Sequence, residues 1–288
     1  ERKIARLSRI RAVTGGISSA MLRLKDRDEL LQEACRVATT EGDFPVAWVR
    51  AMDIGDGCSG IVGFNAKDAR AIEIIEIAAG GTIPDADRPS SLAARLGRPV
   101  VSNDVSADAT MAASVRMQLI GRSYNSLAAL PLSIGERVVA VLVLVAEERG
   151  FFDAEELALL EWLTADLSYA LEHIQNSERL DYLAFYDALT GLPNARLFGD
   201  RLEQLVLAAR QEQSRVCVVV IDLERFTLIN DSRGRAVGDE VLRQVGLRFG
   251  KFLVEPYTLG RIGADTFAAA SPRDGEAINT RLRDRLFE

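Results

Sequence analysis

Residues 126–147, SLAALPLSIGERVVAVLVLVAE, decide the fold of the first half of the chain. Two apolar runs, 126–134 and 137–147, are joined by Gly135 and Glu136. Two such runs around a two-residue turn predict a β-hairpin. This half is therefore expected to contain an antiparallel sheet.

The segments before the hairpin alternate between helix and strand patterns. Apolar spacing predicts amphipathic helices over 1–13 and 26–40, and a further helix over 111–124. Strand patterns cover 46–53, 71–81, where isoleucines interleave with charged residues, and 98–104. This order predicts an α+β domain over 15–176, preceded by an N-terminal helix over 1–14.

A long exit helix is predicted over 153–183. Asp153 as N-cap and Glu156 three positions later form a capping-box pattern. An apolar stripe with steps of three and four residues follows, made of Leu160, Leu163, Leu167, Ala170 and Ile174. The stripe suits a two-stranded coiled coil in a homodimer, and it suits equally well packing against the helix's own domain. Both interpretations stay open.

The second half alternates helices and strands. Helices are predicted over 194–211, 237–253 and 275–287, and strands over 215–224, 256–262 and 266–271, the first of them buried. The pattern predicts an α/β layer with helices over a sheet, so that the long helix joins an α+β domain to an α/β domain. The boundary is expected near 176–186.

Composition narrows the class of protein. The 288 residues carry a net charge of -7, which argues against a nucleic-acid partner. The three cysteines, Cys35, Cys58 and Cys217, lie far apart, which fits a reducing compartment. No apolar run approaches the roughly 18 residues of a membrane span, so a cytoplasmic protein is expected. A start at Glu1 and an end in a helix pattern indicate a piece of a longer protein.

Polar residues stand where the strand patterns of the second half end. Asp222 follows an apolar run, and its carboxylate suits Mg²⁺, although it also suits a helix cap. Asn230 and Asp239, in a loop and at the start of the next helix, can read a purine edge. In RIGADTF (261–267), Gly263 permits a close phosphate approach and Asp265 offers a second carboxylate, while a plain hairpin turn is the alternative.

Three stretches, 187–198, 221–239 and 261–267, together resemble the GGDEF domain of diguanylate cyclases in order and spacing. The resemblance implies GTP and Mg²⁺ as ligands and cyclic di-GMP as the family's product. It also implies a role for each matching residue: metal binding for Asp222, Leu223 through its carbonyl, and Asp265; nucleotide binding for Asn230, Asp239 and Gly263.

Departures from the family pattern point to lost catalysis. Ala264 and Thr266 replace the second glycine and the second acidic residue of the signature, which leaves Asp265 as the lone carboxylate of the pair. A threonine hydroxyl is neutral at pH 7 and cannot replace a carboxylate. Thr227 and Arg235 stand where the family has lysine and histidine. The prediction is a degenerate GGDEF domain over 177–288, incomplete at its C-terminus, with no catalytic residues.

Residues 15–176 resemble a GAF sensory domain in the order of their elements, which leaves the ligand unknown. His173 is expected to be solvated, Cys58 to be a passive loop residue, and Trp48 and Trp162 to be core residues. The resulting hypothesis is a cyclic di-GMP signalling protein in which the GAF domain controls a GTP-binding or dimerising regulator of a downstream EAL-type phosphodiesterase. The alternatives are a working diguanylate cyclase and a module that only dimerises through the 153–183 helix.

Overall fold

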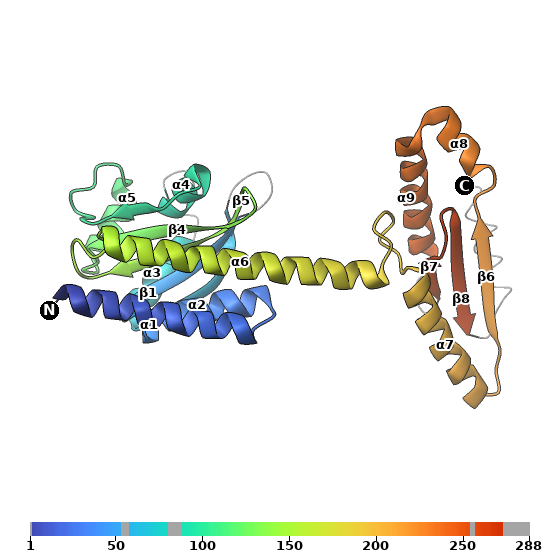
Figure 1. Cartoon of the computed structure of the whole chain (residues 1–288), viewed down its shortest axis with the longest axis horizontal. Helices are drawn as coiled ribbons and strands as arrows, with labels where there is room; N and C mark the ends of the chain where they lie inside the picture. Colours follow the sequence, from blue (N-terminus) through green and yellow to red (C-terminus); the bar gives the residue numbers. More distant parts are fainter. Residues whose placement is uncertain (1, 53–57, 80–87, 254–256, 273–288) are drawn as a thin grey trace. The chain divides into compact units, whose positions relative to one another are not determined.

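The computed structural model describes residues 2–52, 58–79, 88–253 and 257–272 (Figure 1). The chain divides into two compact units, Glu1–Asn176 and Ser177–Glu288. None of the helices in the described ranges is both long enough and apolar enough to span a membrane.

The described part of the first unit contains a five-stranded antiparallel sheet in the order β2-β1-β5-β4-β3. Its strands are β1 (Val46–Met52), β2 (Cys58–Ala66), β3 (Val100–Ser102), β4 (Ser126–Ile134) and β5 (Arg137–Ala146). The predicted hairpin is confirmed, because β4 and β5 pair from Ser126 with Ala146 to Ile134 with Arg137. Gly135 in its turn has φ 59°, a left-handed conformation that favours glycine.

Helices cover both faces of this sheet. On one face, α1 (Arg2–Arg23), α2 (Arg27–Thr40) and α6 (Ala154–Phe185) share a hydrophobic cluster with the strands. On the other face, α3 (Ala69–Ala79), α4 (Pro89–Leu96) and α5 (Ala113–Ile120) form a second cluster. The N-terminal helix extends beyond its predicted end at residue 14, and Ile10, Val13 and Ile17 are buried in the first cluster. Helix α1 is therefore part of this unit's core.

The strand predicted over 71–81 is wrong, because 69–79 forms helix α3. Ala71, Ile74 and Ile75 are buried at helical spacing, whereas Ile72 is exposed. The carboxylate of Asp68 accepts a hydrogen bond from the Ala71 amide at 2.9 Å, which stabilises the start of the helix. Over so short a segment, the alternation of isoleucine and charged residues fits the period of a helix as well as that of a strand. Packing against the sheet selects the helix.

The start of α6 confirms half of the predicted capping box. Asp153 Oδ1 accepts hydrogen bonds from the amides of Glu155 and Glu156, at 2.9 and 3.3 Å. The reciprocal part is wrong, because the Glu156 side chain is fully buried and its oxygens have no hydrogen-bond partner among the described residues.

The predicted apolar stripe of α6 packs inside the first unit. Leu160, Leu163, Leu167 and Ile174 are buried in the first cluster together with Leu171, and Ala170 packs against this cluster partly buried. A dimer seam along this stripe is therefore wrong. The core assignment is right for Trp48 but wrong for Trp162, which is 75% exposed. His173 is exposed as predicted, whereas Cys58 begins β2 instead of lying in a loop.

The described part of the second unit has three antiparallel strands in the order β6-β8-β7, namely β6 (Val216–Asp222), β7 (Thr258–Arg261) and β8 (Thr266–Pro272). Helix α7 (Ala195–Gln211) packs on one face against Ala268 and Ala270. Helices α8 (Phe226–Arg233) and α9 (Arg235–Phe252) pack on the other, around Phe267.

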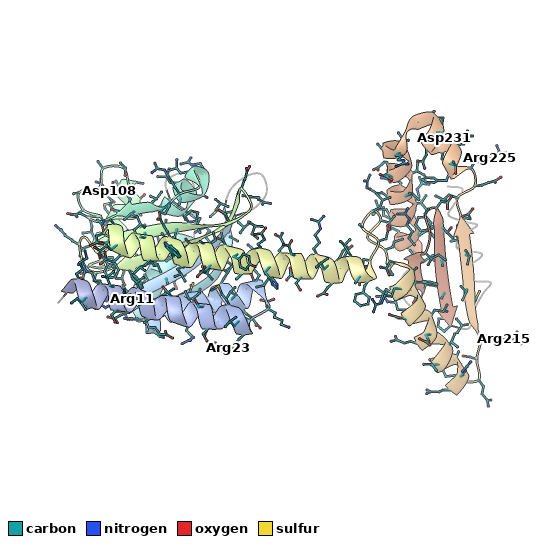
Figure 2. All side chains as sticks on the ribbon, in the orientation of Figure 1. Arg11, Arg23, Asp108, Arg215, Arg225 and Asp231 are labelled. Carbon is teal, nitrogen blue, oxygen red and sulfur yellow. The ribbon has the colours of Figure 1, made fainter. Side chains whose placement is uncertain are left out.

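Two predictions for the second unit are wrong. Strand β6 is not buried on both faces, since Val218 and Val220 are exposed. The residues expected in a loop before Gly234 instead form α8, in which Asp231 is exposed, as is Arg225 just before the helix (Figure 2). The helix predicted over 275–287 lies outside the described residues.

Candidate functional site

The RIGADTF stretch forms the turn between β7 and β8. The amides of Ile262 and Gly263 both donate to the carbonyl of Thr266, at 2.9 and 3.2 Å. A β-carbon built at Gly263 would stand 3.0 Å from Cβ and Oγ1 of Thr266, which is tighter than ordinary contact. The absence of a side chain at this position therefore helps to keep the turn close to Thr266.

Strand pairing brings the predicted metal ligands to one end of the sheet. Asp222, the last residue of β6, pairs with Thr266, and Thr266 Oγ1 donates to Asp222 Oδ1 at 3.1 Å. The Leu223 amide donates to the carbonyl of Asp265 at 3.2 Å, and the Leu223 carbonyl accepts from the Phe226 amide at 3.2 Å. The structure thus brings Asp222, Leu223 and Asp265 together around the turn.

These donors suit Mg²⁺ in kind, because carboxylate and carbonyl oxygens are the ligands that this ion prefers. Within the described ranges, however, the chain has no cluster of three or more acidic, histidine or cysteine side chains that could hold a metal. The set fits an ion that keeps several waters or phosphate oxygens as ligands. Bound there, Mg²⁺ would neutralise phosphate charge through contacts with Asp222, Asp265 and the Leu223 carbonyl.

The predicted purine-reading residues lie where α8 meets α9. A β-carbon built at Gly238 would stand 1.9 Å from Oδ1 of Asn230, so a side chain at 238 would displace the Asn230 amide. Glycine at 238 therefore lets the Asn230 amide lie against the backbone of α9, next to Asp239. Both Asn230 and Asp239 are partly buried. The described contacts do not link this pair to Asp222, so the site residues form two groups within one unit.

An ion pair that the sequence reasoning missed joins two of the motifs. Arg261 Nη1 donates to both carboxylate oxygens of Asp187, at 2.9 and 3.1 Å, and Nη2 donates to the carbonyl of Ala264. The Arg261 amide also donates to the carbonyl of Pro193 at 2.9 Å. The signature turn is therefore fixed to the loop that follows α6. The sequence shows one charged residue in each of the two motifs, Asp187 and Arg261, but nothing in it indicates that the two pair.

The environment of Asp187 favours its ionised form. Burial raises the pKa of this carboxyl, but the hydrogen bonds from Thr190 and the ion pair with Arg261 outweigh burial and hold the pKa below its ordinary value. The amide and hydroxyl of Thr190 donate to Asp187 Oδ1 at 2.9 and 2.7 Å. The negative charge of Asp187 therefore links the loop after α6 to the turn between β7 and β8.

Comparison with known families agrees with this architecture. Residues 25–172, just over half of the chain, match the family model described as "GAF domain", and residues 184–286 match the model described as "Diguanylate cyclase, GGDEF domain". The two units of the chain thus correspond to two known domain families. The chain belongs to the GAF-domain family, and a GGDEF domain follows its GAF domain.

Curated relatives match part of this chain and part of their own length. Diguanylate cyclase DgcP of Escherichia coli is 37% identical over 36% of this chain and 30% of its own length. The bifunctional diguanylate cyclase/cyclic di-GMP phosphodiesterase MucR of Pseudomonas aeruginosa is 31% identical over 58% of this chain and 24% of its own. The chain thus spans less than a third of either relative.

Among solved structures, the GGDEF domain of DgcB from Caulobacter crescentus, in complex with c-di-GMP, is similar to part of this chain. It is 31% identical and covers 35% of this chain and 60% of that one, with a TM-score of 0.34.

Removing the Asp187 charge should destabilise the turn between β7 and β8. For Asp187→Asn we expect the free energy of unfolding to fall by about 1–3 kcal/mol, because the buried charge of Arg261 then lacks its anionic partner. The pKa of Asp187 is lower in the folded chain than in the unfolded chain, where it is about 3.9. The ionised side chain therefore stabilises the fold fully above this unfolded pKa, and this stabilisation is lost as the pH falls through the folded pKa. The variant should therefore lose less stability than the parent on acidification.

Hydrogen exchange over residues 186–194 and 258–272 measures the loosening of the turn. Circular dichroism across acid pH measures the change in acid stability. Asp200→Asn, an exposed carboxylate on α7, is the matched control and should behave like the parent. Unchanged exchange at the hairpin in Asp187→Asn would contradict the anchoring role.

Proposed function

We propose that the chain is part of a cytoplasmic cyclic di-GMP signalling protein whose GGDEF domain binds GTP with Mg²⁺ but does not cyclise it. The GAF domain would control this regulator. The order of the two domains and the relatives named as diguanylate cyclases support the signalling role. One contact in the site supports the absence of turnover.

That contact is the hydrogen bond from Thr266 Oγ1 to Asp222 Oδ1, at 3.1 Å. A glutamate at this position would place a second negative charge and a second set of metal ligands beside Asp222. Threonine instead offers a neutral hydroxyl, which occupies part of the Asp222 carboxylate and cannot act as a base at pH 7. Loss of a general base alone typically costs about 10²–10⁴ in rate.

Binding requires less than catalysis, and the groups needed for binding are present. Asn230 and Asp239 provide an amide and a carboxylate for the guanine edge, and Gly238 leaves room for Asn230. Asp222, Asp265 and the Leu223 carbonyl provide oxygens for Mg²⁺, while Gly263 keeps the turn open to a phosphate. We assign these roles as proposals from the donor chemistry and the family pattern.

The regulated partner that fits best is an EAL-type phosphodiesterase domain in the parent protein. MucR, which combines cyclase and phosphodiesterase activities by its name, supports this pairing. The parent sequence beyond Glu288 would then contain a Glu-Ala-Leu motif with metal-binding carboxylates.

The outer face of α6 is the surface we propose for a homodimer. Trp162 and Tyr169 are 75% and 72% exposed and lie one heptad apart, opposite the stripe that is buried in the first unit. Large aromatic side chains at this spacing suit contact with the same face of a second copy. Dimerisation would thus use a different face of the helix from the stripe predicted by the sequence.

Charging that face should separate the copies. We expect the parent chain to sediment as a dimer, and Trp162→Glu to shift it towards monomer because a carboxylate would be buried in the contact. Glu161→Gln, an exposed change on a neighbouring face of the same helix, should keep the dimer. A monomeric parent chain in analytical ultracentrifugation would overturn the proposed dimer.

Calorimetric titration with GTP and Mg²⁺ tests binding. The parent chain should bind, and Asp222→Ala and Gly238→Ala should each weaken binding by roughly tenfold or more, equivalent to about 1.4 kcal/mol. Gly250→Ala is the matched control on α9, since a β-carbon there meets nothing within 4 Å. A dimer that binds no GTP would leave the third function, pure dimerisation, as the better assignment.

Product analysis tests the lack of turnover. The parent chain incubated with GTP and Mg²⁺ should form no cyclic di-GMP, and the double variant Ala264→Gly/Thr266→Glu should gain activity by restoring the carboxylate. Thr266→Val, which removes the hydroxyl without adding charge, should stay inactive. Product formed by the parent chain and abolished by Asp222→Ala would instead establish the rival function, a working diguanylate cyclase.

A further inference from the structure

Glu156 is a buried carboxyl that the site in the second unit does not use. Its side chain is fully buried, and neither of its oxygens has a hydrogen-bond partner among the described residues. It lies four residues before Leu160 and seven before Leu163, on the face of α6 that packs into the first cluster. A carboxyl at this position costs stability that an apolar side chain would not, so it points to a role other than packing.

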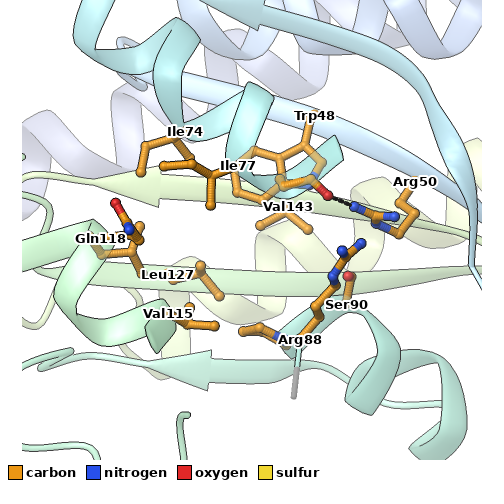
Figure 3. A pocket seen from close by; sticks show the side chains of 13 residues that line it. Trp48, Arg50, Ile74, Ile77, Arg88, Ser90, Val115, Gln118, Leu127 and Val143 are labelled. Carbon is orange, nitrogen blue, oxygen red and sulfur yellow. Dashed lines mark hydrogen bonds between the residues drawn. The ribbon is translucent and has the colours of Figure 1, made fainter. Parts of the chain in front are cut away.

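Two other buried polar side chains of the GAF domain do have partners. Arg50 lines a cavity on the opposite face of the sheet, and its guanidinium donates to the carbonyl of Ala78 (Figure 3). The buried hydroxyl of Ser126 donates to the carbonyl of Glu148 at 2.6 Å. Glu156 therefore differs from the usual buried polar group, which is hydrogen-bonded.

Helix α1 lies beside the start of α6, where Glu156 is buried. Lys3 Nζ donates to Glu155 Oε1 at 2.8 Å, and Arg6 Nη1 donates to the carbonyl of Gly150 at 2.7 Å. These contacts hold the first turns of α1 over the residues on either side of Glu156. Movement of these turns would therefore open Glu156 to solvent.

An alternative partner for Glu156 lies on its own helix. In a capping box, the side chain at this position accepts a hydrogen bond from the amide of the N-cap residue, here Asp153. The positive end of the helix dipole also favours a negative charge in the first turn. Asp153 caps the amides of Glu155 and Glu156, but the Glu156 side chain is buried instead of reaching back. The first turn of α6 thus allows two arrangements of Glu156, one neutral and buried and one ionised and capping.

We propose that Glu156 is a proton switch for the packing of α1 against α6. It is protonated while α1 covers it, because an ionised carboxylate has no partner in the apolar cluster. When the pH rises, the proton passes to solvent, the carboxylate turns to the Asp153 amide, and the first turns of α1 separate from α6. The GAF domain would thus respond to pH through the helix that leads out of it. The switch does not depend on nucleotide binding in the GGDEF domain.

The other ionisable groups at this end of the first cluster define the pH range of the switch. They are Lys3, Arg6 and Arg9 on α1, Asp43 after α2, Glu148 and Asp153 before α6, and Glu155 on α6. The hydrogen bond with Glu155 raises the pKa of Lys3, and the hydrogen bond from Lys67 lowers the pKa of Asp43, so both stay charged across neutral pH.

The remaining elements of the cluster add little charge. Its strand residues are apolar, and α2 adds the thiol of Cys35, whose pKa is raised by burial. His173, the one histidine of the chain, is exposed on α6 and is the same in every variant that tests the switch. A pH dependence that disappears with the Glu156 carboxyl therefore belongs to Glu156.

Infrared spectroscopy of the full chain tests the protonation state. At pH 7, the spectrum of the parent minus that of Glu156→Gln should contain the carbonyl stretch of a protonated carboxyl. Glu161→Gln removes an exposed carboxylate from the same helix and should give no such band. A difference spectrum for Glu156→Gln that lacks the protonated band would overturn the proposal.

Hydrogen exchange of residues 2–23 between pH 5 and 8, corrected for intrinsic exchange rates, tests the release of α1. Protection in the parent should fall by up to about tenfold per pH unit, because each opening releases one proton. Glu156→Gln should remove this pH dependence, while Glu161→Gln should keep it. Glu156→Met, with an apolar side chain of similar length, should also remove it and decides the test if the glutamine variant does not fold. Equal slopes in the parent and in a folded Glu156 variant would contradict the switch.

Discussion

The alternation of side chains along β1 determines how the first unit is built. Ala47 and Val49 point into the cluster shared with α1, α2 and α6, while Val46 and Trp48 point into the cluster shared with α3, α4 and α5. Because the side-chain period of a strand is two, a shift of register by one residue would exchange the two cores. The same alternation places α3, α4 and α5 on the sheet face opposite the exit helix α6.

In the second unit, contacts far apart in sequence define the position of the hairpin site. Helix α6 ends at Phe185, and the loop that follows contains Asp187, which holds Arg261 at the base of the signature turn. The distance along the chain from the end of the exit helix to this anchor is short. A change at the end of α6 is thus connected to the turn by one loop and one ion pair. This gives a physical route within the unit from helix to site.

Features set by local sequence were predictable, and features set by packing were not. Neighbouring residues predict the hairpin turn at 135–136 and the Asp153 cap. The departures of Ala264 and Thr266 from the GGDEF signature can likewise be read from the sequence. Helix α3 was missed because its isoleucines fit both periods. The exposure of Trp162 was missed because the face that α6 buries is chosen by the sheet. The pair between Asp187 and Arg261 joins residues 74 positions apart, which no local pattern encodes.

Helix α1 has a practical consequence for anyone who excises the GAF domain. Similarity to the family begins at residue 25, yet Ile10, Val13 and Ile17 of α1 are fully buried against the same cluster as Leu31 and Leu163. A fragment cut at the limit of similarity would lose that cover and expose apolar surface to solvent. The folding unit and the unit of sequence similarity therefore differ by one whole helix, and an expression boundary belongs before α1.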